Sequence, residues 1–246
     1  MRYTLIIPAY NEEKIIYNNI EILYKKIQQI RHKLRTNIEL IILDDGSKDS
    51  TFIEAQRLIK KYPQIKYAWM KGPSRRENLI SYISTEVETR YVGYMDCDLA
   101  TNLDDLENLI MISNKYDIVS GSRYLTSSKM YRSIDRAIIS VLFNFFVRLL
   151  FRSKIRDHEC GFKIFDTKKL KEIIKLTGIG NKDRRMFWDS EMWVYAQSLG
   201  YKVLEIPIKW NAGKQSALRF TSELSMIKYI IKFWARRKWT RKNLKY

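Results

Sequence analysis

The stretch YVGYMDCDLA, residues 91–100, indicates the architecture of the chain. Mostly apolar residues lead directly into Asp96 and Asp98, as in a buried strand that ends at an active-site edge. Side chains alternate along an extended segment, so the two carboxylates converge on one point. Such a pair is costly unless a cation or a proton neutralises it. The stretch predicts either a divalent metal that holds a substrate diphosphate or, as the simpler alternative, a solvated turn after a strand.

Strand patterns and helix patterns alternate around this stretch. Short apolar runs bounded by polar turns predict strands, and longer runs with apolar residues at helical spacing predict helices. The expected strands cover 3–7, 38–43, 65–69 and 91–95, and the expected helices cover 51–61, 77–85 and 103–113. This alternation predicts an α/β fold with a mainly parallel sheet flanked by helices, and it places the acidic loops along one edge.

The turn after the first strand argues against two common nucleotide-binding folds. We expect Pro8 to end the strand and Asn11 to be the N-cap of the following helix. The turn contains no glycine, which argues against a dinucleotide-binding fold and against a P-loop. The second strand leads into Asp44 and Asp45, at the position where open α/β sheets bind ligands.

Composition limits the class of protein. A chain of 246 residues with 46% hydrophobic and 13% aromatic residues fits one large globular domain. Two distant cysteines predict a reducing compartment without a disulfide framework, and two histidines argue against a His-rich zinc site. Met1 and Arg2 lead straight into a strand pattern, so we expect no signal peptide. The formal net charge of +18 calls for an anionic partner, which could be nucleic acid, lipid or a phosphorylated small molecule.

Several motifs follow one another along the chain. They are IPAYNE at 7–12, LDDGS at 43–47, MDCDLA at 95–100, GSRY at 121–124, DHECGFK at 157–163, and WDSE at 188–191 with LGYKVLEIPI at 199–208. In this order they resemble the family two inverting glycosyltransferases, and within them the polyprenyl-phosphate sugar transferases, which include dolichyl-phosphate mannose and glucose synthases and undecaprenyl relatives. The resemblance spans residues 3–219 and implies an A-type glycosyltransferase fold, Rossmann-like, with a mainly parallel sheet.

The resemblance implies a donor site at the acidic edge. The residues expected to line the base and ribose pocket of a nucleotide-sugar are Pro8, Tyr10, Glu12, Asp44 and Asp45. Asp96 and Asp98 would orient a Mg²⁺ or Mn²⁺ ion that bridges the diphosphate, which makes Asp96 a donor-site residue and Asp98 a catalytic one. Carboxylate oxygens suit these hard cations, and a metal would stabilise charge on the departing nucleoside diphosphate.

The resemblance also implies that Asp157 acts on the acceptor side as a catalytic residue. An acceptor phosphate is mostly ionised at neutral pH because its second pKa is about 6. Asp157 is therefore expected to position the acceptor or the sugar, or else to act as a base. Asp189 and Glu191 are alternatives, for which a surface or helix-cap role is an equally good explanation. The basic turn at 71–76 lacks the glycine-rich form common in relatives, so its diphosphate contacts stay open.

Residues 130–152 predict a helix that is apolar around most of its circumference. One polar stripe recurs every fourth position, formed by Arg136, Ser140, Asn144 and Arg148. The apolar length is shorter than the roughly 20 residues that span a bilayer, so the helix either packs in protein or lies in the membrane interface. In the family this helix lies at the membrane, which implies that Arg136 and Ser140, together with Arg123, hold the lipid phosphate.

Positive charge is concentrated at the end of the chain. No acidic residue follows Glu223, while eight basic residues alternate with apolar and tryptophan residues. We therefore predict a catalytic domain at 1–219, which includes the interface helix, and a basic amphipathic membrane-surface helix at 220–246. Nucleic acid could use the same charge, but no recognition motif accompanies it. The expected partner is thus an anionic membrane surface and not nucleic acid.

Together the patterns predict a hexosyltransferase attached peripherally to the cytoplasmic face of a membrane, with a nucleotide-sugar donor and a polyprenyl phosphate acceptor. The residues that continue after Asp98 favour UDP-glucose as the donor. One rival is a family-two transferase with a saccharide hydroxyl acceptor. A sugar-phosphate nucleotidyltransferase would need a glycine-rich first loop. A non-enzymatic membrane- or nucleic-acid-binding module would have no use for the acidic edge.

Overall fold

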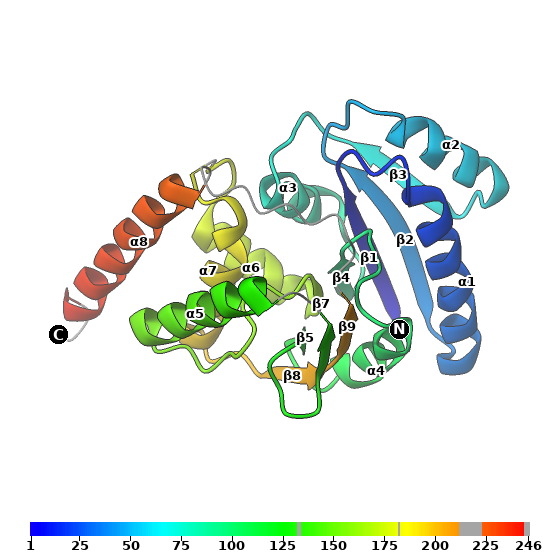
Figure 1. Cartoon of the computed structure of the whole chain (residues 1–246). Helices are drawn as coiled ribbons and strands as arrows, with labels where there is room; N and C mark the ends of the chain where they lie inside the picture. Colours follow the sequence, from blue (N-terminus) through cyan, green and yellow to red (C-terminus); the bar gives the residue numbers. More distant parts are fainter. Residues whose placement is uncertain (132–133, 182, 212–222, 244–246) are drawn as a thin grey trace.

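The computed structural model describes residues 1–131, 134–181, 183–211 and 223–243, with the backbone alone at 134–136, 223–226 and 238–243. Within these ranges a seven-stranded sheet has the order β3-β2-β1-β4-β7-β5-β8 (Figure 1). Its strands are β1 (Arg2–Ala9), β2 (Asn37–Asp44), β3 (Ile65–Trp69), β4 (Tyr91–Met95), β5 (Ile118–Ser122), β7 (Phe162–Asp166) and β8 (Val203–Pro207). Neighbouring strands are parallel except at β7, which is antiparallel to β4 and β5. The prediction of a mainly parallel sheet is confirmed.

Helices cover both faces of this sheet. The first face carries α1 (Ile16–Leu34), α2 (Thr51–Lys61) and α4 (Leu103–Ser113), and the second carries α3 (Arg76–Glu86), α6 (Thr167–Thr177) and α7 (Trp188–Ser198). Alternate residues of β1 divide between the two cores: Leu5 and Ile7 pack against the first set of helices, and Ile6 packs against the second. The predicted helices 51–61 and 103–113 and the strand 65–69 have the observed bounds.

The expectation that Pro8 ends the first strand is wrong, because β1 continues to Ala9. The N–H of Asp45 donates to the carbonyl of Ala9 at 2.8 Å, and this register turns the nitrogen of Pro8 away from β2. On that other side the pairing with β4 has already ended at Ile6. The missing N–H of proline therefore costs the sheet no hydrogen bond.

The expectation that Asn11 caps the first helix is also wrong, because α1 begins at Ile16. Asn11 has a φ of 57°, outside the helical region. Its Oδ1 accepts the N–H of Lys48 at 2.9 Å, and its own N–H donates to Oγ of Ser47 at 3.0 Å. Asn11 therefore joins the loops that follow β1 and β2.

Two further helices, α5 (Ile134–Phe151) and α8 (Glu223–Asn243), lie outside the layers (Figure 1). The helix predicted from 130 starts later because β6 (Lys129–Tyr131) pairs with β9 (Lys209–Asn211). The rings of Phe151 on α5 and Phe233 on α8 lie 5.3 Å apart, which packs the two helices together. In the described part of the chain, no helix has both the length and the apolar character to cross a membrane. The predicted boundary at 219 lies outside the described residues.

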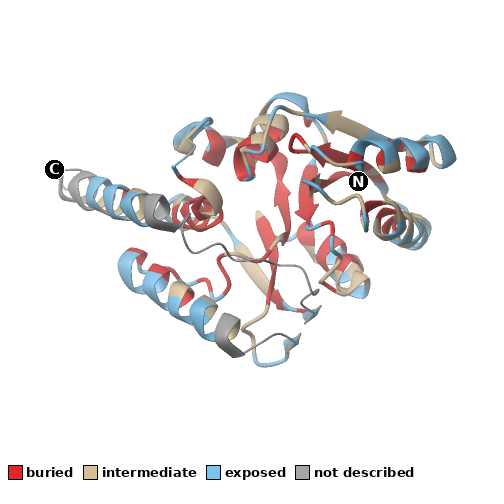
Figure 2. Cartoon of the chain, turned by 45° about the horizontal axis from the view of Figure 1, so that its top comes forward, coloured by how far each residue is buried: buried red, intermediate tan, exposed pale blue. Residues whose placement is uncertain are grey.

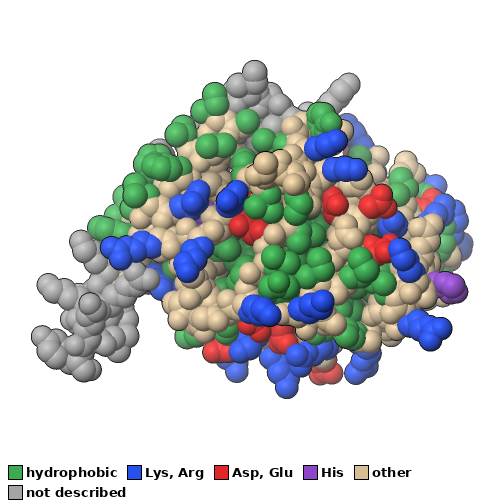
Figure 3. All heavy atoms as spheres, turned by 90° about the horizontal axis from the view of Figure 1, so that it is seen from below, with side chains coloured by type: hydrophobic (Ala, Val, Ile, Leu, Met, Phe, Trp, Pro, Cys, Tyr) green, Lys and Arg blue, Asp and Glu red, His purple; other side chains and the backbone are tan. Residues whose placement is uncertain are grey.

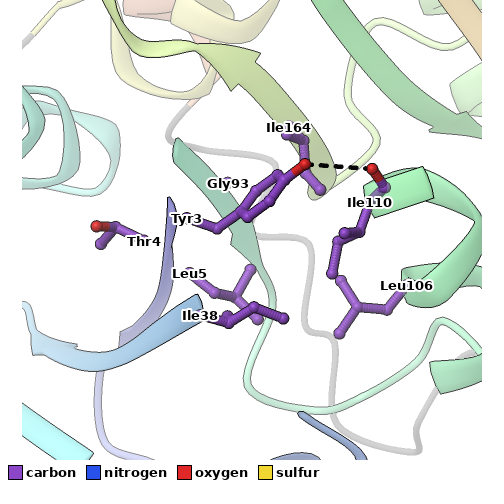
Figure 4. A pocket seen from close by; sticks show the side chains of 8 residues that line it. All are labelled: Tyr3, Thr4, Leu5, Ile38, Gly93, Leu106, Ile110 and Ile164. Carbon is purple, nitrogen blue, oxygen red and sulfur yellow. Dashed lines mark hydrogen bonds between the residues drawn. The ribbon is translucent and has the colours of Figure 1, made fainter. Parts of the chain in front are cut away.

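Buried residues concentrate in the strands and on the sides of the helices that face them (Figure 2). A small apolar gap lies among Tyr3, Leu5, Gly93 and Leu106, where Gly93 has no side chain to fill it (Figure 4). The hydroxyl of Tyr3 donates to the carbonyl of Ile110 at 3.4 Å beside this gap. The gap is a packing feature of the first core, separate from the acidic edge.

Candidate active site

The loops after β1 and β2 form one connected unit at the carboxyl edge of the sheet. The N–H of Glu12 donates to Oγ1 of Thr51 at 2.8 Å, and the N–H of Glu13 donates to Oδ2 of Asp49 at 3.2 Å. Oε2 of Glu13 accepts the N–H of Ser50 at 3.0 Å. With the two bonds of Asn11, these contacts hold the predicted donor loops together. Pro8 is partly buried beneath them, and Tyr10 is exposed beside them.

Asp44 and Asp45 lie at the predicted edge, but both are buried and bonded to protein. Asp44 accepts the N–H of Ser47 at 2.7 Å and the hydroxyl of Tyr67 at 2.6 Å. Asp45 accepts the N–H of Arg75 at 2.7 Å, among other donors from the 74–78 segment. In this structure the two carboxylates therefore shape the wall of the predicted donor pocket.

The basic turn at 71–76 approaches that wall closely. A Cβ added to Gly72 would lie 1.9 Å from the carbonyl oxygen of Asp45, and one on Gly46 would lie 2.4 Å from the nitrogen of Gly72. The two backbones can approach this closely only because both positions are glycine. The close packing of the turn at 71–76 against the loop after β2 therefore depends on Gly46 and Gly72.

Asp96 and Asp98 line a small pocket immediately after β4, together with Ala100, Thr101, Gly161 and Trp210. The side chain of Asp96 is 55% exposed. Oδ1 of Asp98 accepts the N–H of Ala100 at 3.0 Å, across a turn in which Leu99 has a φ of 50°. The turn alternative is therefore correct as local geometry. This turn orients the carboxylate of Asp98, and both Asp96 and Asp98 still line the pocket.

Gly161 and Asn19 support this pair from either side. A Cβ at position 161 would lie 2.0 Å from Oδ2 of Asp96, so this side-chain position requires glycine. Nδ2 of Asn19 on α1 donates to the carbonyl of Cys97 at 3.0 Å. Sequence reasoning missed both residues, because both contacts depend on how distant segments pack.

The carboxylates of the edge repel one another. Partial burial, together with the charges of Asp98, Asp49 and Asp96, raises the pKa of Glu12 from 4.5 to about 7. Partial desolvation of its carboxylate and the nearby charge of Asp98 likewise raise the pKa of Asp96, against the opposing charge of Arg76. A cation would relieve this repulsion.

The donor set fits a hard cation that is shared with a substrate. Within the described ranges, no group of three or more His, Cys, Asp and Glu is placed to hold an ion. Mg²⁺ in particular is commonly held by one or two carboxylates together with substrate phosphates. Asp96 and Asp98 would be those carboxylates.

A buried charged cluster lies under Asp96. The fully buried carboxylate of Asp189 accepts Nε of Arg76 at 2.8 Å and Nζ of Lys163 at 2.6 Å, as well as the hydroxyl of Tyr94. Burial alone would raise the pKa of Asp189, but Arg76 and Lys163 lower it to about 2. Nη2 of Arg76 then reaches within 3.9 Å of Oδ1 of Asp96. The surface alternative for Asp189 is wrong.

Glu191 is also buried, in a second cluster that reaches α8. Arg184 is fully buried, donates to both oxygens of Glu77 at 2.8 and 3.0 Å, and reaches Glu191 at 3.3 Å. The hydroxyl of Tyr229, on α8, donates to Glu191 at 3.0 Å. The surface alternative for Glu191 is therefore wrong as well.

Asp157 and Arg123 form a close pair where β5 ends. Nε and Nη2 of Arg123 donate to the two carboxylate oxygens of Asp157, each at 2.7 Å, and the backbone N–H of Arg123 adds a third bond at 2.9 Å. The side chain of Asp157 is fully buried and that of Arg123 is 11% exposed. The guanidinium lies 5.3 Å from the ring centroid of Trp210. Asp157 therefore holds Arg123 in place.

The interface helix α5 attaches to the same region through its polar stripe. The buried Asn144 accepts the backbone N–H of His158 at 2.9 Å and contacts its Nδ1 at 2.7 Å. Burial lowers the pKa of His158 to about 3, so its ring is neutral. Ser140 is partly buried on the same helix, and the side chain of Arg136 lies outside the described residues.

Comparisons with known proteins find relatives over most of this chain. The profile of "Glycosyl transferase family 2" matches residues 4–174. Glycosyltransferase AglD of Haloferax volcanii is 30% identical over 94% of this chain but 36% of its own length, so the chain spans about a third of that relative. Dolichyl-phosphate beta-glucosyltransferases of Trichomonas vaginalis (ALG5A) and Dictyostelium discoideum are each 30% identical, over 93% of this chain and 72% of theirs.

Two solved structures share the fold at low sequence identity. Mannosyltransferase PcManGT of Pyrobaculum calidifontis, with GDP-Man and Mn²⁺, has a TM-score of 0.62 at 16% identity, over 96% of this chain and 63% of that one. Glucosyl-3-phosphoglycerate synthase of Mycobacterium tuberculosis, with Mn²⁺, UDP and phosphoglyceric acid, has a TM-score of 0.64 at 14% identity, over 94% of this chain and 78% of that one.

Proposed function

The chain belongs to glycosyl transferase family 2, and from this premise we propose that it transfers a hexose from a nucleotide-sugar to polyprenyl phosphate. The predicted A-type glycosyltransferase fold is confirmed, and the protein is a glycosyltransferase. The observation that carries the proposal is the arrangement of the acidic edge. Trp210 lines the pocket of Asp96 and Asp98 and lies 5.3 Å from Arg123, which Asp157 holds. Helix α5 is bonded to His158, the residue after Asp157. The relatives named dolichyl-phosphate beta-glucosyltransferases support this acceptor class and a glucosyl group as the one transferred, for which we propose UDP-glucose as the donor.

In the proposed reaction, one set of residues acts on the leaving diphosphate and another on the attacking phosphate. An oxygen of the acceptor phosphate attacks C1 of the sugar while the bond from C1 to the diphosphate breaks, and the electron pair leaves with the nucleoside diphosphate. Attack opposite the leaving group inverts C1. Asp96 and Asp98 would hold Mg²⁺ or Mn²⁺, which when bound stabilises charge on the diphosphate. The donor loops with Tyr10 and Glu12 would hold the nucleoside.

Arg123 would bind the acceptor phosphate. Asp157 occupies Nε and Nη2, so the opposite edge of the planar guanidinium, at Nη1, is directed away from it. Charge-assisted hydrogen bonds from arginine to phosphate are among the strongest in proteins. Because the phosphate is already mostly ionised, no strong base is needed. We therefore assign Asp157 the positioning role. Arg136 and Ser140 remain proposed phosphate ligands from α5.

We further propose that α5 and α8 hold the protein peripherally on an anionic membrane, at its cytoplasmic face. Hydrophobic side chains gather along α5, at the upper left of Figure 3. The exposed ones are Ile138, Ile139, Val141, Leu142, Phe145, Phe146, Leu149 and Leu150. On α8 the exposed Lys228, Lys232 and Arg236 add about 1 kcal/mol each near an anionic leaflet.

One observation favours the hydroxyl-acceptor alternative. Glu159 is partly exposed, and burial together with Asp189 raises its pKa to about 8, which suits a general base for a hydroxyl. A phosphate acceptor would not need such a base. Glu159→Gln should therefore leave transfer to polyprenyl phosphate within about threefold of the original rate, whereas a hydroxyl acceptor would make it lose about 100-fold or more.

The deciding experiment incubates the purified protein with Mn²⁺, undecaprenyl phosphate and a panel of radiolabelled nucleotide-sugars. We expect the label from UDP-glucose in the organic-extractable lipid fraction. Label that never enters this fraction with any donor would refute the lipid acceptor. Asp98→Asn should abolish transfer, and full turnover by this variant would remove the metal role. The control Asp104→Asn alters an exposed acid that pairs with Lys26 on the protein surface.

A further inference from the structure

Trp210 connects the two halves of the candidate site. It lines the pocket of Asp96 and Asp98, and its ring lies 5.3 Å from the guanidinium carbon of Arg123. A cation within about 6 Å of an indole centroid is attracted to the ring, and most strongly so where water is largely excluded. The side chain of Arg123 is 11% exposed, so this contact is largely desolvated.

The backbone holds Trp210 on both sides. On one side, β9 pairs with β6, with Met130 opposite Trp210. On the other, the N–H of Asn211 donates to the carbonyl of Ala100 at 2.8 Å, and the N–H of Asn102 donates to the carbonyl of Lys209 at 3.0 Å. Trp210 is therefore fixed to the segment that immediately follows Asp98, and any movement of the metal pocket would carry the indole with it.

Asp157 and Trp210 restrain the guanidinium in different ways. The two hydrogen bonds to Asp157 lie in the guanidinium plane and fix its position along that plane. The aromatic contacts, with Trp210 at 5.3 Å and Tyr124 at 5.6 Å, attract the guanidinium to ring faces and so add a restraint that Asp157 does not supply. Without the indole, Arg123 would keep its partner Asp157 but could tilt relative to the pocket.

We propose that Trp210 is a positioning residue that holds Arg123 at a set place beside the Asp96–Asp98 pocket, so that an anionic phosphate acceptor meets the donor sugar in line. The inference rests on the proposed function, because it concerns the acceptor of that reaction. It assigns Trp210 to the acceptor side, although the residue lies 87 positions beyond Arg123 and in none of the family motifs.

The test compares Trp210→Leu and Trp210→Phe with a matched control in steady-state transfer to undecaprenyl phosphate. We expect Trp210→Leu to raise KM for undecaprenyl phosphate about tenfold, while KM for UDP-glucose changes less than about twofold. Trp210→Phe should restore most of the loss, because a smaller ring still attracts the guanidinium. The control is Tyr116→Leu. Tyr116 precedes β5, whereas Arg123 follows that strand, and its partly buried ring lies 4.8 Å from Nζ of Lys202. Its kinetics should be unchanged.

A double-mutant cycle makes the assignment specific. If Trp210 acts through Arg123, adding Trp210→Leu to Arg123→Gln should change KM for undecaprenyl phosphate less than about twofold further. Independent, additive effects would overturn the inference, as would an unchanged acceptor KM in Trp210→Leu or an equal rise in both KM values.

Two controls keep the inference separate from other failures. Failure of the unmodified protein to label the lipid with any donor overturns the proposed function, which is a different result. If Trp210→Leu does not fold, as judged by circular dichroism, Trp210→Phe carries the test with an expected two- to threefold rise in acceptor KM. No rise, or a rise in donor KM alone, would then overturn the inference.

Discussion

The substitution Gly161→Ala tests whether the position of Asp96 matters to catalysis. The new Cβ would lie 2.0 Å from Oδ2 and 2.5 Å from Cγ of Asp96, whereas real Cβ contacts stay beyond about 3 Å. The carboxylate must therefore move by about 1 Å. Because the side chain of Asp96 is 55% exposed, it can move into water at little cost in stability. A displacement of about 1 Å at a reacting centre costs about 100-fold in rate.

The assay measures kcat for lipid labelling, Mn²⁺ binding by the loss of the free-ion paramagnetic resonance signal, and thermal unfolding. We expect kcat to fall about 100-fold with weaker Mn²⁺ binding and nearly unchanged Tm. The control is Gly200→Ala, where φ is 70° and a Cβ would meet no atom within 4 Å. It should lower stability by about 1 kcal/mol without changing kcat. Unchanged kcat and Mn²⁺ affinity in Gly161→Ala would refute the reasoning.

Three further predictions address charge, stability and the membrane. Protonation of Glu12, whose pKa is raised to about 7, should weaken apparent Mn²⁺ affinity about tenfold between pH 8 and pH 6, and Glu12→Gln should remove that dependence. Arg184→Met should lower the free energy of unfolding in urea by about 3–5 kcal/mol, because it leaves buried carboxylates without their cation. Replacing Phe145 and Phe146 together by serine should weaken co-sedimentation with anionic vesicles at least tenfold, because two exposed rings could no longer be buried in the membrane interface.

Each of these predictions has its own contrary result. An Mn²⁺ affinity that is independent of pH, or one that keeps its slope in Glu12→Gln, contradicts the first. The same raised pKa means that the metal-free folded state holds an extra proton, so stability attributable to Glu12 falls as the pH rises from 4.5 to about 7. For the second, the control Arg57→Met removes a surface pair with Glu54 and should cost less than about 1 kcal/mol, and a loss in Arg184→Met no larger than that contradicts the prediction. For the third, vesicle binding equal to that of the unmodified protein removes α5 from the proposed anchor.

Local patterns predicted most of the fold because the helices and strands bury regular faces. The helix 103–113 forms as predicted because Leu106, Leu109 and Ile110 repeat at helical spacing and all reach the core. Asn11 misled the prediction because its side chain has a competing partner in the next loop, the N–H of Lys48. Short-range capping rules contain no information about that distant backbone.

The contacts that the sequence did not predict join residues from distant segments. Asp189 meets Lys163, Arg76 and Tyr94 only once β7 is inserted next to β4 and α7 covers the second face. No periodicity links those positions, and the reversed direction of β7 has no local signal. Asp96 and Asp98 were found because both carboxylates lie within one short stretch of sequence.

The reversed strand has a consequence for how specificity can diverge in such an enzyme. Because β7 starts at the edge where the parallel strands end, the segment before it brings Asp157 to the end of β5. The loops proposed to bind the nucleotide all come from residues before 101, and the proposed acceptor contacts all come from residues after 118. Replacements in the second part can therefore change which acceptor is used while the first part keeps its nucleotide. We expect chimaeras of relatives joined near residue 115 to inherit their donor and their acceptor from different parents.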